Sequence, residues 1–92
     1  MNNTNLLPLG SVVKLTTTPT SILIIGYLHQ DKETKKRYSY CGINYPFGVT
    51  LSQDTVLFNP DAIQKIEFEQ AESPEASEFR KAIETVLAAE QS

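Results

Sequence analysis

The apolar stretch ILIIGYL at positions 22–28 constrains the fold more than any other part of the sequence. It is too short to cross a bilayer, and it lacks the alternation of a strand with one wet face. Such a continuous apolar run is typical of a strand that is covered on both faces. We therefore expect it to be the central strand of a sheet, and we expect Ile22, Leu23, Ile24 and Ile25 to include core residues from both faces.

Shorter patterns around this run predict the other strands. The polar stretch QDKETKKR at 30–37 reads as a hairpin connection, and Pro46 and Gly48 end the strand that follows it. Asn59, Pro60 and Asp61 look like a cap with proline in a single helical turn. The expected strands are 12–15, 22–28, 38–45, 55–58 and 64–69.

The tail from Ser73 to about Glu90 is predicted to be a helix. Ser73 suits the N-cap position, and Pro74 fits the first turn. An apolar stripe recurs at three- and four-residue spacing and must dock on something, either the chain's own sheet or another protein. Its members are Ala76, Phe79, Ile83, Val86 and Leu87.

The fold class that these patterns favour is α+β. We expect one domain over residues 1–92, with a β-rich part at 6–70 and the helix at about 73–90. The sheet should be a small twisted antiparallel one of four to five strands, and an SH3-like barrel stays open as an alternative.

Charge and composition argue against several classes of function. A formal net charge of −3 gives no support to nucleic-acid or membrane-surface binding. One cysteine and one histidine make neither an internal disulfide nor a zinc site of Cys and His alone, and no cofactor motif is visible. The N-terminus has no positively charged, apolar signal segment, so we expect a cytoplasmic protein.

The register of the predicted hairpin decides whether Cys41 and His29 form a reactive pair. A turn near the middle of 30–37 places Tyr40 opposite Tyr27, Tyr38 opposite His29 and Cys41 opposite Gly26. Cys41 then lies about 10 Å from His29 along the strands and on the other face. We therefore interpret Cys41 as a small buried hydrophobe, and we expect no enzyme, although a slip of one residue reverses the faces.

Aromatic residues are the strongest candidates for recognition. The stretch YSYCGINYPFG at 38–48 holds three of the four tyrosines. Aromatic cross-strand pairs also stabilise sheets without a partner, but tyrosine is enriched at protein interfaces. The predicted partner-binding residues are Tyr27, Tyr38, Tyr40, Tyr45 and Phe47.

Four segments resemble, in order and spacing, a family of small bacterial proteins called domain of unknown function (DUF) 4176. They are LLPLGSVVKL, ILIIGYL, YSYCGINYPFG and VLFNPDAIQKIEFE, and the resemblance covers roughly residues 6–70. The chain departs from the family pattern at Phe47, where an acidic residue is expected, and at Gln70, where glycine is expected.

The resemblance implies a role rather than a reaction. Members of the family look like companions of the type VII secretion apparatus of Gram-positive bacteria, beside toxins with an LXG-type N-terminal domain. The implied function is a non-catalytic accessory, chaperone or adaptor that binds such a toxin or another secretion component. An immunity-type inhibitor of a toxin is the alternative, and a homo-oligomer is compatible with either role.

Overall fold

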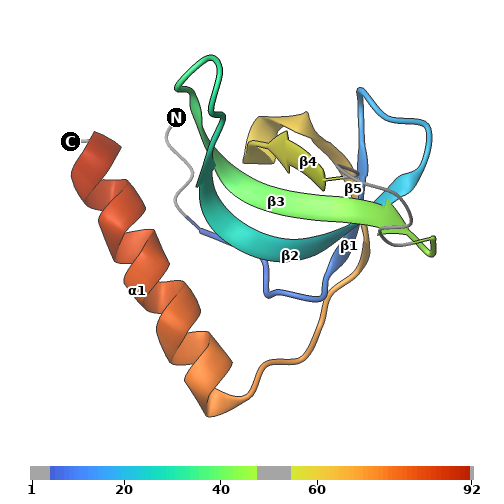
Figure 1. Ribbon diagram of the computed structural model, residues 1–92. Coiled ribbons are helices and arrows are strands. Elements are labelled where there is room, and N and C mark those ends of the chain that lie inside the picture. The colour runs from blue at the N-terminus through green and yellow to red at the C-terminus, as the bar shows by residue number, and fades with distance from the viewer. Residues whose placement is uncertain (1–4, 48–54, 92) are drawn as a thin grey trace.

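Five antiparallel strands form the sheet of the computed structural model, which describes residues 5–47 and 55–91 (Figure 1). The predicted α+β class is confirmed. Every predicted strand is present, and each lies within three residues of the expected bounds. The strands are β1 (Val12–Leu15), β2 (Ser21–Gln30), β3 (Arg37–Tyr45), β4 (Thr55–Phe58) and β5 (Ile63–Phe68), and they lie in the order β4-β3-β2-β1-β5.

The sheet is curved but open. β4 and β5 are its two edges, and a single 3-10 turn over Pro60–Ala62 joins them. No pairing between β4 and β5 is present in the described residues, so the closed form of the SH3-like alternative is not adopted. Asn59 precedes the turn but does not cap it with its side chain, because its Oδ1 accepts a hydrogen bond from the Ser39 amide at 3.0 Å.

The predicted hairpin register is correct near the turn and shifts by one residue beyond it. Tyr27 pairs with Tyr40, and His29 pairs with Tyr38, as expected. A bulge between Ile24 and Gly26 then places Ile24 opposite Gly42. Ile24 therefore shares a face with Tyr40. Without the bulge, the predicted register places Ile25 on that face instead.

The central strand is fully covered on one face only. Ile22 and Ile24 are completely buried, Leu23 is half-buried, and Ile25 is 44% exposed at the bulge. The expectation of core residues on both faces was therefore wrong for Ile25. We call the face of the sheet that packs against the core the inner face. The core cluster consists of Leu6, Val13, Leu15, Ile22, Ile24, Tyr40, Phe58 and Leu87.

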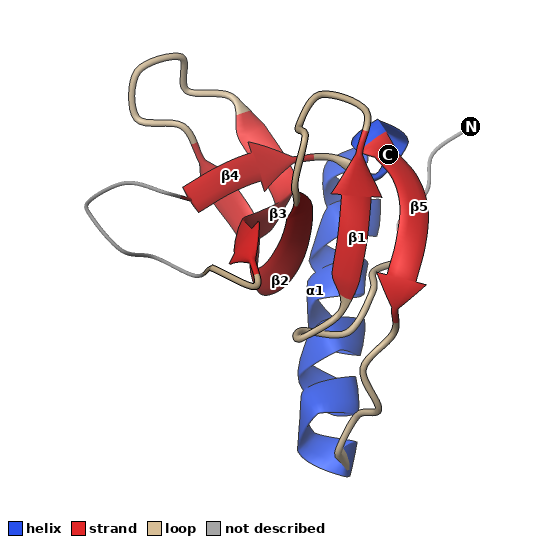
Figure 2. Ribbon diagram, turned by 90° about the vertical axis from the view of Figure 1, so that its right-hand side faces the viewer, coloured by secondary structure: helices blue, strands red, loops and turns tan. Residues whose placement is uncertain are grey.

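Helix α1 (Pro74–Gln91) lies beside the inner face of the sheet (Figures 1 and 2). Its start is the predicted one, because Ser73 Oγ accepts a hydrogen bond from the Ala76 amide at 3.2 Å. Leu87 is buried in the core and Ile83 packs against it, while Phe79 and Val86 remain exposed on the flank of the helix.

No helix in the described part of the chain combines the length and the apolarity that crossing a membrane requires.

Candidate functional site

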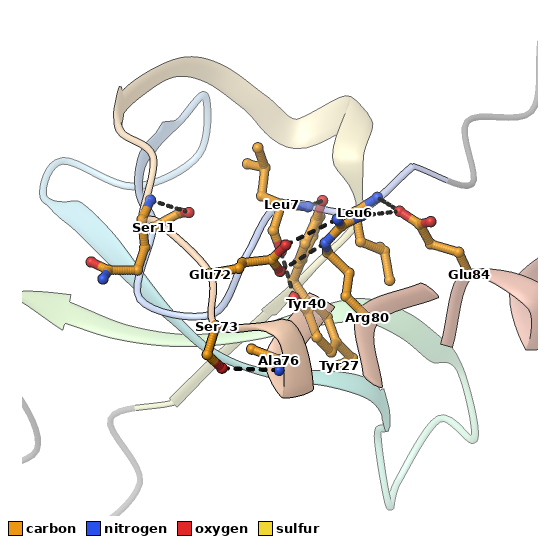
Figure 3. A network of polar contacts seen from close by, with 11 residues as sticks. Leu6, Leu7, Ser11, Tyr27, Tyr40, Glu72, Ser73, Ala76, Arg80 and Glu84 are labelled. Atoms are coloured by element: carbon orange, nitrogen blue, oxygen red, sulfur yellow. Dashed lines mark hydrogen bonds and ion pairs between the residues drawn. The ribbon is translucent and has the colours of Figure 1, made fainter. Parts of the chain in front are cut away.

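Tyr27 and Tyr40 hold the N-terminal segment of the chain against the inner face. The Leu7 amide donates a hydrogen bond to the Tyr40 hydroxyl at 2.9 Å, and the Tyr27 hydroxyl donates one to the Leu7 carbonyl at 2.6 Å (Figure 3). Tyr40 is 1% exposed and stacks on Phe58, with ring centroids 5.1 Å apart. Tyr40, a predicted partner-binding residue, therefore uses both its ring and its hydroxyl within the chain.

Burial also changes the acidity of these two phenols. It raises the pKa of Tyr27 to about 12, with a further contribution from the negative charge of Glu72. Burial also raises the pKa of Tyr40. Both hydroxyls are therefore neutral at physiological pH, so they remain hydrogen-bonding groups and do not act as bases.

Arg80 on helix α1 binds two carboxylates, one on the segment that precedes α1 and one on α1 itself. Its guanidinium binds Glu72 through two nitrogens, at 2.8 and 3.0 Å, and binds Glu84 at 2.9 Å (Figure 3). Glu84 also accepts a hydrogen bond from the Leu6 amide at 2.7 Å. The hydrogen bonds from Arg80 lower the pKa of Glu72. Both carboxylates of this cluster are bound by groups of the chain itself, which is typical of a structural contact.

Cys41 and His29 lie closer together than the uninterrupted register predicts. A β-carbon placed on Gly26 would be 3.2 Å from His29 Nε2 and 3.7 Å from Cys41 Cβ. The two side chains therefore share a face, and the prediction of opposite faces was wrong. The positive φ of 55° at Leu28 breaks the alternation between Tyr27 and His29.

Proximity does not make this pair an activated nucleophile. Cys41 is 3% exposed, and burial raises the pKa of its thiol. A thiol of this kind stays protonated at neutral pH, whereas the attacking species in cysteine chemistry is the thiolate. Among the described residues, no three His, Cys, Asp or Glu side chains gather as metal ligands do.

The strongest candidate for recognition is on the outer face of the sheet, away from α1. A hollow of about 370 Å³ opens there between β1, β2, β3 and β5. Tyr45 is 47% exposed and Phe68 53% exposed on its walls, and Phe47 follows at 67% exposed. The hollow is lined by Val12, Ser21, Tyr45, Glu67 and Phe68.

Two rows of cross-strand neighbours build this surface. One row runs Phe68, Val12, Leu23, Ile43 and Thr55 across all five strands. The other runs Lys65, Lys14, Ser21 and Tyr45 across four of them. Glu67 reaches across β1 and accepts a hydrogen bond from the Ser21 hydroxyl. The result is an apolar floor with a polar, charged rim, which is the usual composition of a protein interface.

The five predicted partner-binding residues are thus divided between the two faces and the hairpin. Tyr27 and Tyr40 are on the inner face, Tyr38 is half-buried opposite His29, and Tyr45 lines the hollow on the outer face. Phe47 is exposed in the turn after β3. Sequence reasoning missed Phe68, Lys14 and Lys65. The alternation of residues 64–69 predicts a strand, but only the pairing of β5 with β1 places its side chains beside Tyr45.

A family model matches residues 6–79, and its description is domain of unknown function (DUF4176). The chain belongs to the DUF4176 family. The match includes all five strands and the first turns of α1, so the predicted membership is confirmed. Neither the curated proteins nor the solved structures contain a significant match to this DUF4176 domain.

Proposed function

We propose that this DUF4176 protein is a non-catalytic, cytoplasmic accessory, a chaperone or adaptor that binds an LXG-type toxin or another component of type VII secretion. The family resemblance supplies the class of partner. The observation that carries the proposal is the outer-face hollow, where the exposed rings of Tyr45 and Phe68 flank an apolar floor. Rigid aromatic side chains beside a depression are common anchors of protein interfaces, because they bury much area and lose little entropy.

The inner face is a weaker candidate for the same role. Tyr27, Tyr40 and Arg80 already bind groups of their own chain, so a partner would have to displace those groups. A partner at the outer face displaces only solvent from the exposed parts of Tyr45 and Phe68. This difference favours the outer face as the binding surface.

Co-purification with the toxin encoded beside the gene tests the proposal. We expect a stable complex in which a Tyr45→Ala/Phe68→Ala variant binds at least about tenfold more weakly, equivalent to about 1.4 kcal/mol. Val86→Ala is the matched control, because Val86 is an exposed apolar residue on the flank of α1. Equal loss in both variants would contradict the assignment of the surface.

The activity of the complex distinguishes an adaptor from the immunity-type alternative. An adaptor leaves the catalytic domain of the toxin active, whereas an inhibitor abolishes its activity at one-to-one stoichiometry. Failure of the toxin and of the other secretion components to bind would refute the proposed function.

A further inference from the structure

Lys14 and Lys65 are a pair of like charges on the outer face, in the row that continues to Ser21 and Tyr45 at the hollow. They are direct cross-strand partners on β1 and β5, so their side chains leave the same face as neighbours. Neither lysine makes an ion pair or a side-chain hydrogen bond with any other described residue. Like charges in this position destabilise a sheet, so folding alone gives no reason for the pair.

Protection of the sheet edge does not account for the pair either. A lysine on an edge strand discourages aggregation, and Lys65 on β5 can serve that purpose. Lys14, however, is on β1, an interior strand between β2 and β5. Its partner in the same row on β2 is Ser21, whose hydroxyl is bound to Glu67. Two lysines and one glutamate leave the rim with one net positive charge on a chain whose formal net charge is −3.

The position of β5 at the edge of the sheet is a second feature of this surface, and it favours an extended ligand. It is the last strand of the sheet, and five of its six residues are exposed. The main chain of an edge strand accepts another extended segment as an additional strand. A strand added there continues both rows of the outer face, beside Lys65 in one row and beside Phe68 in the other.

We propose that the outer face of this protein binds an extended acidic segment of its partner, which lies along β5, places a carboxylate at Lys14 and Lys65, and places an apolar side chain at Phe68. This inference rests on the proposed protein-binding function and names the chemistry of the segment that is bound. The two rows are two residues apart on β1, at Lys14 and Val12, and three residues apart on β5, at Lys65 and Phe68, because the register shifts between Val12 and Val13. Because side chains on one face of a regular extended segment are two residues apart, the segment carries the acidic and the apolar residue at positions i and i+2.

The neighbouring apolar surface favours a peptide over a free anion. Phe68 is 53% exposed directly beside the charged row, and inorganic phosphate would leave it uncovered. A second copy of this chain is a weaker fit. If the β5 strands of two copies paired in antiparallel fashion about Ile66, Lys65 of one copy would lie opposite Glu67 of the other. Glu67, however, already accepts a hydrogen bond from Ser21 of its own chain.

Selection of displayed random peptides against the full-length protein tests the inference. Peptides of about nine residues are long enough to span the six residues of β5. We expect enriched peptides to contain Asp or Glu with an apolar residue two positions away. Their affinity should fall at least about tenfold in a Lys14→Gln/Lys65→Gln variant, and it should fall in about 1 M NaCl, where the Debye length is about 3 Å. Amides of β5 should gain protection from hydrogen exchange on binding.

A Lys32→Gln/Lys36→Gln variant is the matched control, because it removes the same charge from the exposed hairpin connection. It should bind the selected peptides within about twofold of the wild type. The melting temperature supplies an independent measurement. If the Lys14–Lys65 pair exists for binding, its removal leaves the free protein equally stable or more stable.

Several results would overturn the inference. They are enrichment of peptides without acidic residues, absence of any enrichment, undiminished binding to the Lys14→Gln/Lys65→Gln variant, displacement of the peptides by sodium phosphate at constant ionic strength, or a lower melting temperature in that variant. A toxin that requires Tyr45 and Phe68 but not the lysines would leave the proposed function intact and refute this inference. Failure of the toxin and of the other secretion components to bind would refute the proposed function, while the peptide selection would still decide the role of the lysines.

Discussion

At the scale of single residues, Gly42 shows how closely the inner face is packed. A β-carbon on Gly42 would be 2.3 Å from Ile22 Cγ2 and 2.9 Å from the Leu23 carbonyl oxygen. Because the second obstacle is backbone, we expect Gly42→Ala to lower the free energy of unfolding by about 1–3 kcal/mol. Gly26→Ala is the matched control, since its nearest obstacle is the movable ring of His29, and it should change stability by less than about 1 kcal/mol. Equal effects in urea denaturation would contradict this account of the packing.

The two inner tyrosines predict how stability depends on alkaline pH. Burial raises the folded-state pKa of Tyr27 to about 12, above the value of 10.0 for an unperturbed phenol. The unfolded chain therefore loses this proton first, and the contribution of Tyr27 is complete below about pH 10 and disappears as the pH rises to about 12. Urea denaturation across this range should show falling stability, and Tyr27→Phe should flatten the fall. An ultraviolet titration in which Tyr27 ionises near pH 10 in the folded protein would refute the prediction.

At the scale of elements, sequence reasoning located the strands but not the register along the whole of β2. Near the turn, the length of the connection determines the pairing, so Tyr27 and Tyr40 were placed correctly. Farther on, residues 22–25 are apolar without alternation, and such a pattern does not distinguish one register from the next. The bulge at Ile25 and the positive φ of Leu28 each change which side chains share a face. The bulge places Ile24 on the face of Tyr40, and the positive φ of Leu28 brings His29 to the side of Cys41; the apolar pattern predicts neither change.

The attachment of helix α1 is also an element-scale property. Arg80 is partly buried and bonds to two carboxylates, whereas Arg37 forms a more exposed ion pair with Glu90 near the end of the helix. Hydrogen bonds to charged groups are worth more when they are shielded from water. We expect Arg80→Ala to lower the free energy of unfolding by about 1–3 kcal/mol, and we expect Arg37→Ala to lower it by less than about 1 kcal/mol. Thermal and urea unfolding of both variants would check this order, and a larger effect from Arg37 would contradict it.

At the scale of the whole molecule, the two ends of the chain depend on each other. The N-terminal segment puts Leu6 into the core beside Leu87, and its amide binds Glu84 on α1. The same segment is held from the sheet by the hydroxyls of Tyr27 and Tyr40. It is therefore enclosed between the helix and the inner face, so removal of the helix uncovers both. A partner bound at the outer face, as proposed, would leave these inner contacts intact.

Truncation after Ala71 tests this interdependence. The cut removes Leu87 and Ile83 from the core and leaves Leu6 and Tyr27 without cover from the helix. Losing Leu87 alone is expected to cost about 2–5 kcal/mol, a large part of the stability of a domain of this size. We expect the truncated chain to unfold or aggregate, as judged by circular dichroism and size-exclusion chromatography. Leu87→Ala should also lower the free energy of unfolding, and Val86→Ala, on the exposed flank of the helix, should change it little. A truncated chain that stays folded and monomeric would show that α1 is dispensable for the fold, and it would make the helix, rather than the outer face of the sheet, the first surface to examine for partner binding.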